Sequence, residues 1–420
     1  MKEVVIVGGG IVGLCCAWHL HEAGMQVTIV DKGDFSEGCS FGNSGMIVPS
    51  HFIPLASPGM IAKGLKWMFS KGSPFYIRPR LNLELAQWLW LFYRSASKKH
   101  VAECAPLLRD MHIEGREFYS RLNSSPGFDF HFDRKGILMM YQTASGEHEE
   151  AETAEMAHEL GIEANILSPA DLRMLDPGIE MNVRGAVHYP GDAHLAPHVL
   201  MQQLIASLRK SGVEFMVNSE VIKIDDKGID GANISLRNNE NIKAKHLVVA
   251  TGTWSGLLMK KSGYKLPMQD GKGYSMTIHQ PDSMPSVPAI LTEARVAITP
   301  MGESLRVAGT LEISGRDEKI NLHKVKSILN AASNYYPELK IADPGPVWYG
   351  YRPCTPDGMP YIGRLSKDSS IVLATGHAMM GLSLAPATGG MVKDIILQDV
   401  NSKDEIKLSI KRFLSTSGEN

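Results

Sequence analysis

The chain has 420 residues, of which 44% are hydrophobic and 21% charged, the composition of an ordinary globular protein. A single hydrophobic core stops growing below this length, so we expect two packed units. The formal net charge of -2 gives no general attraction to nucleic acid, and we expect no nucleic-acid partner. The five cysteines lack paired spacing, which favours buried thiols in a reducing compartment over a disulfide framework or a metal site.

The first residues and the apolar runs of the chain indicate where in the cell the protein resides. Residues 1–3 lead straight into an apolar strand, which leaves no room for a signal peptide. The longest apolar run, residues 85–93, is far shorter than the roughly 20 residues that cross a bilayer. We therefore expect a cytoplasmic body that does not span a membrane.

A glycine-rich turn near the N-terminus lies between a strand and a helix. Residues 4–7 are a β-branched run typical of a buried parallel strand, and residues 8–13 satisfy the pattern G-x-G-x-x-G. Residues 11–22 then have helical spacing, and residues 25–30 form a second strand that ends at Asp31. Strand, glycines, helix, strand and acidic residue follow in the order of a dinucleotide-binding unit.

Each of these residues has a mechanical reason. Gly8 permits the tight turn, Gly10 lets a pyrophosphate approach the backbone, and Gly13 allows close contact between helix and strand. The free N–H groups of the helix N-terminus bind phosphate, and Asp31 is placed to accept hydrogen bonds from ribose hydroxyls. The pattern alone does not distinguish NAD from FAD.

The middle of the chain returns to this unit. Residues 197–211 form an amphipathic helix with Pro197 at its start and Gly212 after its end. Short strands follow, and the one at residues 244–249 ends in Ala-Thr-Gly at residues 250–252, small residues suited to lie beside a cofactor. A strand at 371–374, a small-residue loop at 375–381 and a helix at 386–397 close the pattern.

Several segments together resemble one family. They are VVIVGGGIVG at the start, GNSGM at 42–46, VVATGTW at 248–254, KGYSMT at 272–277, RVAGTLE at 306–312, GYRPCTPDGMPYIGR at 350–364 and TGHAMMGLSLAPATG at 375–389. In this order they resemble the glycine/sarcosine/D-amino acid oxidase superfamily of flavoproteins, and within it the bacterial D-amino acid dehydrogenases, catalytic-subunit type. The resemblance covers essentially the whole chain.

The resemblance implies non-covalent FAD and a set of residues that hold it. The set comprises Gly8, Gly10, Ile11, Val12, Gly13, Asp31 and Lys32 for the ADP half, Ser40, Asn43, Ser44, Gly45, Met46, Ala250, Gly252 and Trp254 along the extended cofactor, and Gly376, Gly381, Leu382 and Ser383 at the isoalloxazine edge. A helix that begins near residues 383–386 would direct its positive end at the flavin pyrimidine ring, where negative charge develops on reduction.

Arg352 matches the family position that binds the substrate carboxylate. A planar guanidinium binds a carboxylate through two hydrogen bonds and keeps its charge at any working pH. The alternative for Arg352 is a structural ion pair, with Asp357 as a candidate partner. Tyr274 and His377 are further candidates for the pocket, although a buried hydrogen-bonded tyrosine and a loop-bracing histidine explain them as simply.

Two positions depart from relatives in the superfamily. Glycine and sarcosine oxidases place a tyrosine over the substrate where this chain has Ala297, which predicts a roomier pocket and argues against glycine as substrate. Relatives with covalently attached flavin use a cysteine at the position of Gly350, and Cys354 lies elsewhere, which favours non-covalent FAD.

The expected fold class is α/β. A discontinuous Rossmann-type FAD-binding domain with a glutathione-reductase-like sheet would comprise residues 1–56, 145–254 and 346–400. An α+β substrate domain with an antiparallel sheet would comprise residues 57–144 and 255–345, followed by a tail at 401–420.

The expected function is oxidative deamination of a small D-amino acid. Hydride would pass from Cα–H to flavin N5, and the electrons would pass on to a quinone or another carrier. One alternative is an oxidase or dehydrogenase of a secondary or cyclic amine, such as sarcosine, D-proline or hydroxy-D-proline. Another is a non-catalytic flavin-binding partner subunit. The aromatic and basic residues of 63–93 suit either peripheral contact with the inner face of a membrane or, as the simpler interpretation, a helical pair packed on the body.

Overall fold

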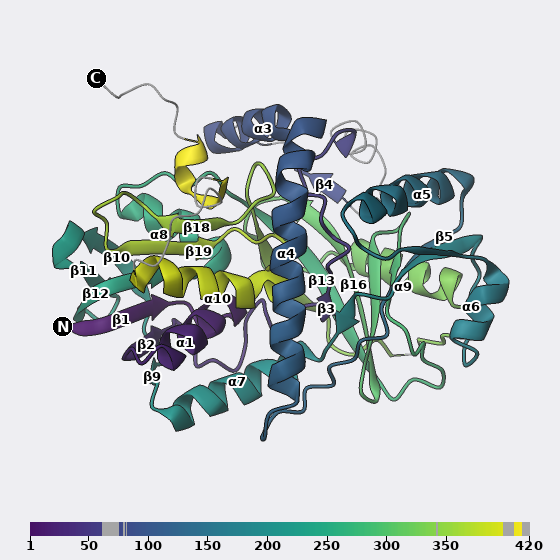
Figure 1. The fold of residues 1–420 in the computed structure, drawn as a ribbon, viewed down its shortest axis with the longest axis horizontal. Helices are drawn as coiled ribbons and strands as arrows, with labels where there is room; N and C mark the ends of the chain where they lie inside the picture. The colour runs from purple at the N-terminus through teal and green to yellow at the C-terminus, as the bar shows by residue number, and fades with distance from the viewer. Residues whose placement is uncertain (61–74, 79, 81, 342, 398–406, 414–420) are drawn as a thin grey trace.

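The computed structural model describes residues 1–60, 75–78, 80, 82–341, 343–397 and 407–413. Two large sheets lie side by side in it, each covered by its own helices (Figure 1). The Rossmann-type expectation for the first sheet is confirmed by its parallel strands. They run in the order β9 (Glu214–Met216), β2 (Val27–Val30), β1 (Lys2–Val7), β12 (Asn241–Val249) and β19 (Ile371–Thr375).

Antiparallel strands extend this sheet. One pair continues from β12, namely β11 (Ala232–Leu236) and β10 (Val221–Asp226), and β18 (Tyr361–Arg364) pairs with β19. The strand register places the ends of β1 and β12 level with each other, because Val7 lies opposite Val249. The glycine turn after β1 and the Ala-Thr-Gly segment after β12 therefore meet at the same edge.

The second sheet is largely antiparallel. Its strands are β17 (Trp348–Cys354), β13 (Gln269–His279), β16 (Ser304–Ile313), β15 (Val296–Met301), β14 (Ala289–Leu291), β5 (Ile137–Tyr141), β7 (Gly185–Tyr189) and β6 (Asn165–Leu167), with β4 (Phe75–Ile77) beside β16. A small ribbon, β3 (Met46–Ile47) with β8 (Ala193–His194), lies apart from both sheets.

The helices divide between the two sheets (Figure 1). Around the first sheet lie α1 (Ile11–Glu22), α4 (Lys98–Asn123), α7 (Pro197–Ser211), α8 (Ser255–Lys261) and α10 (Gly381–Leu397); the others are α3 (Leu83–Ser95), α5 (Ala144–Glu159), α6 (Pro169–Leu175) and α9 (Leu322–Tyr335). Short 3₁₀ turns lie at Gly228–Asp230, Gly252–Trp254 and Ile410–Phe413. Among the described residues, no helix combines the length and apolar character needed to cross a bilayer.

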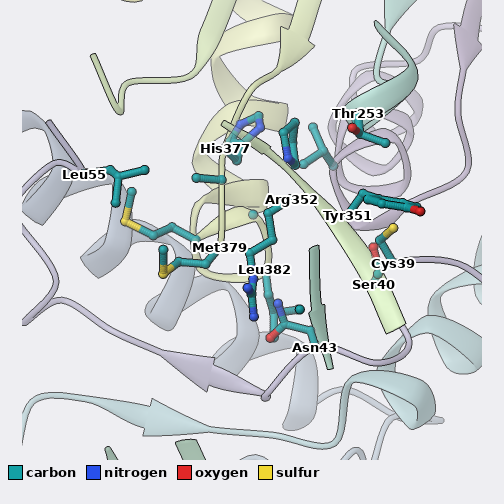
Figure 2. Close-up of a pocket in the computed structure, with 18 of the residues that line it drawn as sticks. Cys39, Ser40, Asn43, Leu55, Thr253, Tyr351, Arg352, His377, Met379 and Leu382 are labelled. Atoms are coloured by element: carbon teal, nitrogen blue, oxygen red, sulfur yellow. The ribbon is translucent and has the colours of Figure 1, made fainter. Parts of the chain in front are cut away.

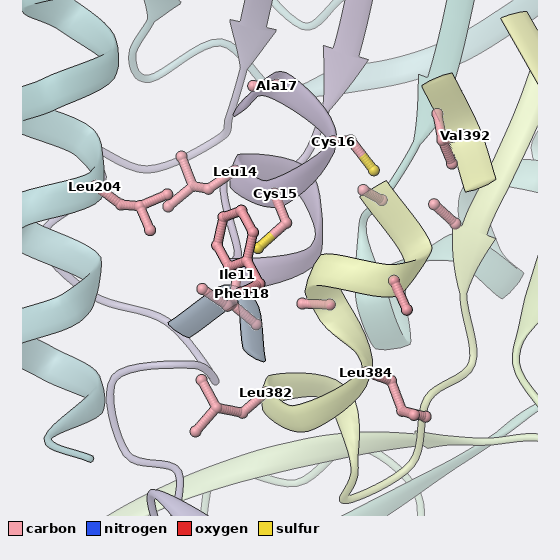
Figure 3. Close-up of a cluster of buried hydrophobic side chains, with 14 of the residues drawn as sticks. Ile11, Leu14, Cys15, Cys16, Ala17, Phe118, Leu204, Leu382, Leu384 and Val392 are labelled. Carbon is pink, nitrogen blue, oxygen red and sulfur yellow. The ribbon is translucent and has the colours of Figure 1, made fainter. Parts of the chain in front are cut away.

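Helix α7 illustrates why the elements form where the sequence predicts them. Pro197 occupies the first turn, where its missing N–H costs no hydrogen bond, and Gly212 ends the helix with a left-handed φ of 101°. Leu200, Leu204 and Leu208 are all buried and recur every four residues, so one face of the helix packs on the core. Figure 3 shows Leu204 in that cluster, facing Leu14 of α1.

Helix α10 begins at Gly381, five residues before the predicted start, so Pro386 lies inside it. Proline lacks the N–H that would bond to the carbonyl of Leu382. The Tyr119 hydroxyl of α4 donates to that carbonyl instead, over 2.9 Å. A side chain from a distant helix thus satisfies the group that local reasoning leaves without a partner.

The sheets divide the chain differently from the expected domains. Strand β7, within residues 145–254, pairs with β5, and β6 pairs with β7, so both belong to the second sheet. Strand β17, within residues 346–400, pairs with β13 of the same sheet. Helix α4, within residues 57–144, packs against α10 of the dinucleotide side. We therefore propose that residues 137–189 and 348–354 count with the substrate domain and α4 with the dinucleotide domain.

Candidate active site

A cavity of about 1600 Å³ lies between the two sheets. It extends from the glycine turn after β1 to Arg352 on β17, and exceeds the roughly 300–1,000 Å³ of an ordinary small-ligand pocket. Nearly all of the predicted site residues line it. The exceptions are Gly13, Gly45, Gly376 and Ser383, which lie behind the lining.

The glycine turn has the close contacts that its sequence predicts. Gly8 has a φ of 109°, a left-handed conformation that suits glycine. A Cβ on Gly13 would lie 1.9 Å from the carbonyl oxygen of Gly8, so a side chain cannot be accommodated where α1 meets the turn. By contrast, a Cβ on Gly10 would meet only the Ser40 hydroxyl, at 3.4 Å. The turn is therefore closed on the protein side and open toward the cavity.

Side chains hold this turn in place. Oδ2 of Asp31 accepts from the Gly9 amide at 2.7 Å, and Oδ1 accepts from the Gly33 amide at 2.9 Å. The Ser40 hydroxyl accepts from the Ile11 amide at 3.0 Å. Asp31 thus anchors the backbone of the turn, and each oxygen retains a lone pair for a ribose hydroxyl.

The residues present fit the ADP half of a dinucleotide. Gly10 provides no side-chain cap for α1, so the helix N-terminus opens into the cavity with the positive end of its dipole. Lys32 lies over the Trp254 ring, with its Nζ 3.7 Å from the ring centroid. The cradle therefore offers donors to phosphates and a flat aromatic wall beside them.

Arg306 holds the loop at Phe41 and Asn43, which lines the cavity. This buried side chain donates to the carbonyls of Phe41 and Asn43, both at 2.8 Å, and to the Thr277 hydroxyl. Burial lowers the pKa of Arg306 to about 10. Asn43 accepts from the Gly45 amide at 2.9 Å. The loop that would run beside the cofactor is thus connected to a strand of the second sheet.

Arg352 lies at the other end of the cavity. Its side chain points toward Asn43 and Leu382 (Figure 2) and donates to the carbonyl of Thr310. It lies over Gly273 on the neighbouring strand, where a Cβ would be 2.4 Å from Nη1. Within the described part of the chain, no carboxylate pairs with Arg352. Asp357, the predicted alternative partner, instead binds Arg412 at 2.6 Å.

Tyr274 and His377 are both buried, line the cavity and each hydrogen-bond within the protein. The Tyr274 hydroxyl accepts from the Asn321 amide at 3.3 Å, on the side of a separate small cavity that Glu312 also lines. Nε2 of His377 is 2.9 Å from the Thr388 hydroxyl of α10, and burial lowers the pKa of His377 to about 3. Both arrangements correspond to the structural interpretation given for these residues.

Comparison with known proteins agrees with this geometry. A family model described as FAD dependent oxidoreductase matches residues 3–395. The chain belongs to this family. A D-amino acid dehydrogenase of Helicobacter pylori is 30% identical to it, covering 96% of this chain and 97% of that protein. A D-amino acid dehydrogenase of Xylella fastidiosa is 31% identical, covering 94% of this chain and 92% of that protein.

Solved structures share the fold. Glycine oxidase from Geobacillus kaustophilus superposes with a TM-score of 0.77 at 21% identity, covering 98% of both chains. L-proline dehydrogenase from P. horikoshii superposes with a TM-score of 0.70 at 19% identity, covering 98% of both chains. FAD is therefore the dinucleotide that the cradle takes, which decides the question that the glycine pattern left open.

Other cavity residues were not predicted from the sequence. His51 and Arg295 also line the cavity, and Trp348 packs between two glycines, because a Cβ on Gly42 or Gly350 would lie 2.1 Å from its ring. The sequence offered only part of the evidence for this packing. Gly350 lies two residues from Trp348 and could have suggested it, whereas Gly42 is distant in sequence. Nothing local to His51 or Arg295 distinguishes them from surface residues.

Proposed function

We propose that the protein holds FAD non-covalently and oxidises the Cα–N bond of a small D-amino acid to an imino acid, which water hydrolyses to a 2-oxo acid. The family supports the redox chemistry, and the names of the bacterial relatives support the D-amino acid. The observation that carries the proposal is Arg352, a half-buried cation without a carboxylate partner among the described residues, in the wall of the cavity that takes FAD.

Arg352 would hold the substrate by its carboxylate. Burial lowers the pKa of Arg352, so a partner anion is worth more here than at the surface. Two parallel N–H···O bonds from a guanidinium restrict both the position and the rotation of a carboxylate. The Cα–H is then oriented before reaction, and orientation accounts for much of the rate gain in such a step.

FAD, when bound, supplies the acceptor for the two electrons. The chain itself would position the reacting carbon, exclude water and hold the amine. The cavity wall on the substrate side is mainly apolar, with Ile290 and Ala297 facing it. Ala297 packs with Met46 and Val48, next to the predicted flavin loop. A substrate held by Arg352 therefore has room for a side chain near Ala297.

Non-covalent attachment is supported by the cysteines near the cavity. Burial raises the pKa of the Cys354 thiol to about 12 and also raises the pKa of Cys39. A thiolate is the reactive form of cysteine, so neither is prepared for bond formation. Acid precipitation should release all of the flavin into the supernatant. Flavin retained in the protein pellet would contradict this part of the proposal.

The test of the function is anaerobic reduction of the bound flavin by a panel of amino acids. The panel contains D- and L-alanine, D-proline, hydroxy-D-proline, glycine and sarcosine, and bleaching of the flavin absorbance is the signal. We expect D-amino acids to bleach the flavin and L-amino acids to leave it oxidised. Arg352→Met should bind FAD normally and lose the bleaching, and Arg352→Lys should retain part of it. Failure of every amino acid with the wild type would support the non-catalytic alternative.

The electron acceptor is tested by turnover. We propose a quinone or carrier rather than dioxygen, and we expect turnover with dyes or soluble quinones and little hydrogen peroxide in air. Helix α3 presents Trp90 and Tyr93, 58% and 63% exposed, with their rings stacked at 6.2 Å. We propose this face as a peripheral membrane contact, which flotation with anionic liposomes tests through Trp90→Ser. The part of 63–93 before residue 75 lies outside the described residues.

A further inference from the structure

A line of polar groups leads from the protein interior to the wall of the cavity. His51 lines the cavity, and its Nδ1 is 3.1 Å from the Ser50 hydroxyl. That hydroxyl donates to Oδ2 of Asp192, and the Ser50 amide donates to Oδ1 of the same carboxylate over 3.0 Å. Asp192 is fully buried between β7 and β8. A buried carboxylate is thus connected to the cavity through a hydroxyl and an imidazole.

The direction of these hydrogen bonds follows from the number of hydrogens. A serine hydroxyl has one hydrogen, and Ser50 gives it to Asp192. The Ser50 oxygen must therefore accept from His51, so Nδ1 carries the hydrogen of the neutral ring. Nε2 then has a lone pair, and it has no hydrogen-bond partner in the described part of the chain. Nε2 of His51 is therefore a hydrogen-bond acceptor in the wall of the cavity.

The surroundings keep the imidazole neutral. Burial lowers the pKa of His51 to about 4, and the positive charge of Arg295, in the turn between β14 and β15, acts in the same direction. His112 of α4 lies beside it, and burial together with His51 lowers the pKa of His112 to about 3. Arg116, also on α4, faces Asp192 rather than the ring. These charged and titratable groups surround His51 and leave it uncharged near neutral pH.

We propose that Nε2 of His51 accepts a hydrogen bond from the amine of the substrate, and that Asp192, acting through Ser50, holds the ring in the tautomer that leaves Nε2 without a hydrogen. The inference rests on the proposed function. The proton stays on the substrate nitrogen, and the hydrogen bond directs the amine toward His51 while Arg352 holds the carboxylate. His51 stays neutral in this contact, because a ring with a pKa of about 4 is too weak a base to take the proton of an ammonium group.

The hydrogen bonds among Asp192, Ser50 and His51 reverse their direction when Asp192 is protonated. Burial raises the pKa of Asp192 to about 7, against the opposing effect of the Ser50 hydrogen bonds. Protonated Asp192 donates to the Ser50 oxygen, Ser50 donates to Nδ1, and the ring hydrogen moves to Nε2. Nε2 then carries a hydrogen, so it can no longer accept a hydrogen bond from the ammonium group and repels it. Below a pH of about 7 the amine loses its acceptor, while Arg352 still binds the carboxylate.

The decisive measurement is the tautomer of His51 in the FAD-loaded protein. Nitrogen-15 NMR of ring-labelled histidine distinguishes a protonated from an unprotonated ring nitrogen, and His51→Gln identifies the His51 signals among the 15 histidines. We expect hydrogen on Nδ1 at a pH of about 8.5 and on Nε2 at about 5.5. Asp192→Asn should hold the low-pH tautomer at both values, because its amide donates to Ser50 permanently.

Kinetics provide the second measurement. In the wild type we expect kcat/KM to fall about tenfold per pH unit below a pH of about 7, with binding of the amine-free carboxylate benzoate unchanged. Asp192→Asn should have a low and nearly flat profile, and Ser50→Ala should remove the dependence on Asp192. Asp176→Asn is the matched control, since Asp176 is also buried and accepts backbone hydrogen bonds, but from Ser286 and Val287 rather than from Ser50.

The outcomes separate the relay from the function. Hydrogen on Nε2 of the wild type at both pH values, or an Asp192→Asn tautomer that matches the wild type, overturns the relay. A tautomer that switches as expected supports the relay even if no amino acid reduces the flavin, in which case only the proposed function fails. If Asp192→Asn does not fold, Ser50→Ala and the wild-type pH series still decide the question.

Discussion

The two ends of the cavity are built in different ways. At the cofactor end, backbone groups of one short stretch, residues 8–13, form the cradle, and Asp31 holds them in place. At the substrate end, Arg352 comes from β17, and the further cavity residues His51 and Arg295 come from two other distant segments. The first end depends on local backbone geometry, and the second depends on how the whole chain folds. Substitutions should therefore affect the two ends through different observables.

The largest effect is expected at Gly13. A Cβ there would lie 1.9 Å from the Gly8 carbonyl oxygen, and backbone on both sides cannot move away. We expect Gly13→Ala to destabilise the protein by about 3 kcal/mol through overpacking and to abolish FAD binding. Thermal unfolding and the flavin content of the purified protein measure this.

Gly10→Ala is the matched variant of the same turn. Gly10 has a φ of -72°, which alanine adopts freely, and its Cβ would meet only the Ser40 hydroxyl. The apoprotein should unfold at the wild-type temperature, while FAD affinity falls at least about tenfold, or about 1.4 kcal/mol. Equal stability losses in Gly10→Ala and Gly13→Ala would contradict the description of the turn as closed on the protein side and open toward the cavity.

The next effect is expected at the substrate end, at Gly273. A Cβ there would lie 2.4 Å from Nη1 of Arg352 and would displace the guanidinium. We expect Gly273→Ala to lower kcat/KM about a hundredfold, the cost of misplacing a binding group by about 1 Å, with FAD content unchanged. Steady-state kinetics with a D-amino acid that reduces the flavin measure it. Gly178→Ala, with no atom closer than 4.0 Å to its Cβ, is the control, and an equal loss there would refute the explanation.

The same contrast explains what the sequence could predict. The strand, turn and helix of residues 2–22 were predicted because hydrophobic period and glycine spacing are local. Arg352 was reached only through resemblance, since a lone arginine before a proline has no local signature. The alternative partner Asp357 was excluded only when the fold brought Arg412 to it.

Other parts of the site could not be predicted for a similar reason. The early start of α10 depends on a Tyr119 hydroxyl from another helix, and the Ser50–Asp192 contact joins residues 142 positions apart. The place of β6 and β7 in the second sheet could not be predicted, because periodicity identifies a strand but not the sheet to which it belongs. Long-range pairing is decided by packing, which no short window of sequence contains.

A smaller effect is expected on specificity at Ala297. Ala297 borders the cavity and packs with Met46 and Val48 at the predicted flavin loop. We expect Ala297→Tyr to fill the room for the substrate side chain and to lower kcat/KM for large D-amino acids by about 10–100-fold, while D-alanine changes little. Ala297→Ser, which adds little volume, should retain the wild-type order of substrates. An equal loss for large and small substrates would place Ala297 outside the side-chain pocket.

The smallest effect is expected on the free energy of unfolding as the pH changes. Buried histidines from both ends of the cavity should contribute to it. Burial lowers the pKa of His51 and His194 to about 4, and of His112 and His377 to about 3. In the unfolded chain these rings take up protons below a pH of about 6.5. Between about 6.5 and 4 the unfolded state therefore binds more protons, and the free energy of unfolding falls as the pH falls.

Asp192 acts in the opposite direction, because its pKa of about 7 makes the folded state bind a proton that the unfolded state does not. Four histidines outweigh one carboxyl, each ring contributing about 1.4 kcal/mol per pH unit. Urea unfolding of the apoprotein at a series of pH values measures the net slope. His377→Asn should reduce that slope by about one ring's share, whereas substitution of the exposed His148 should not. Stability that rises as the pH falls through this window would mean that the buried rings are already protonated in the folded protein.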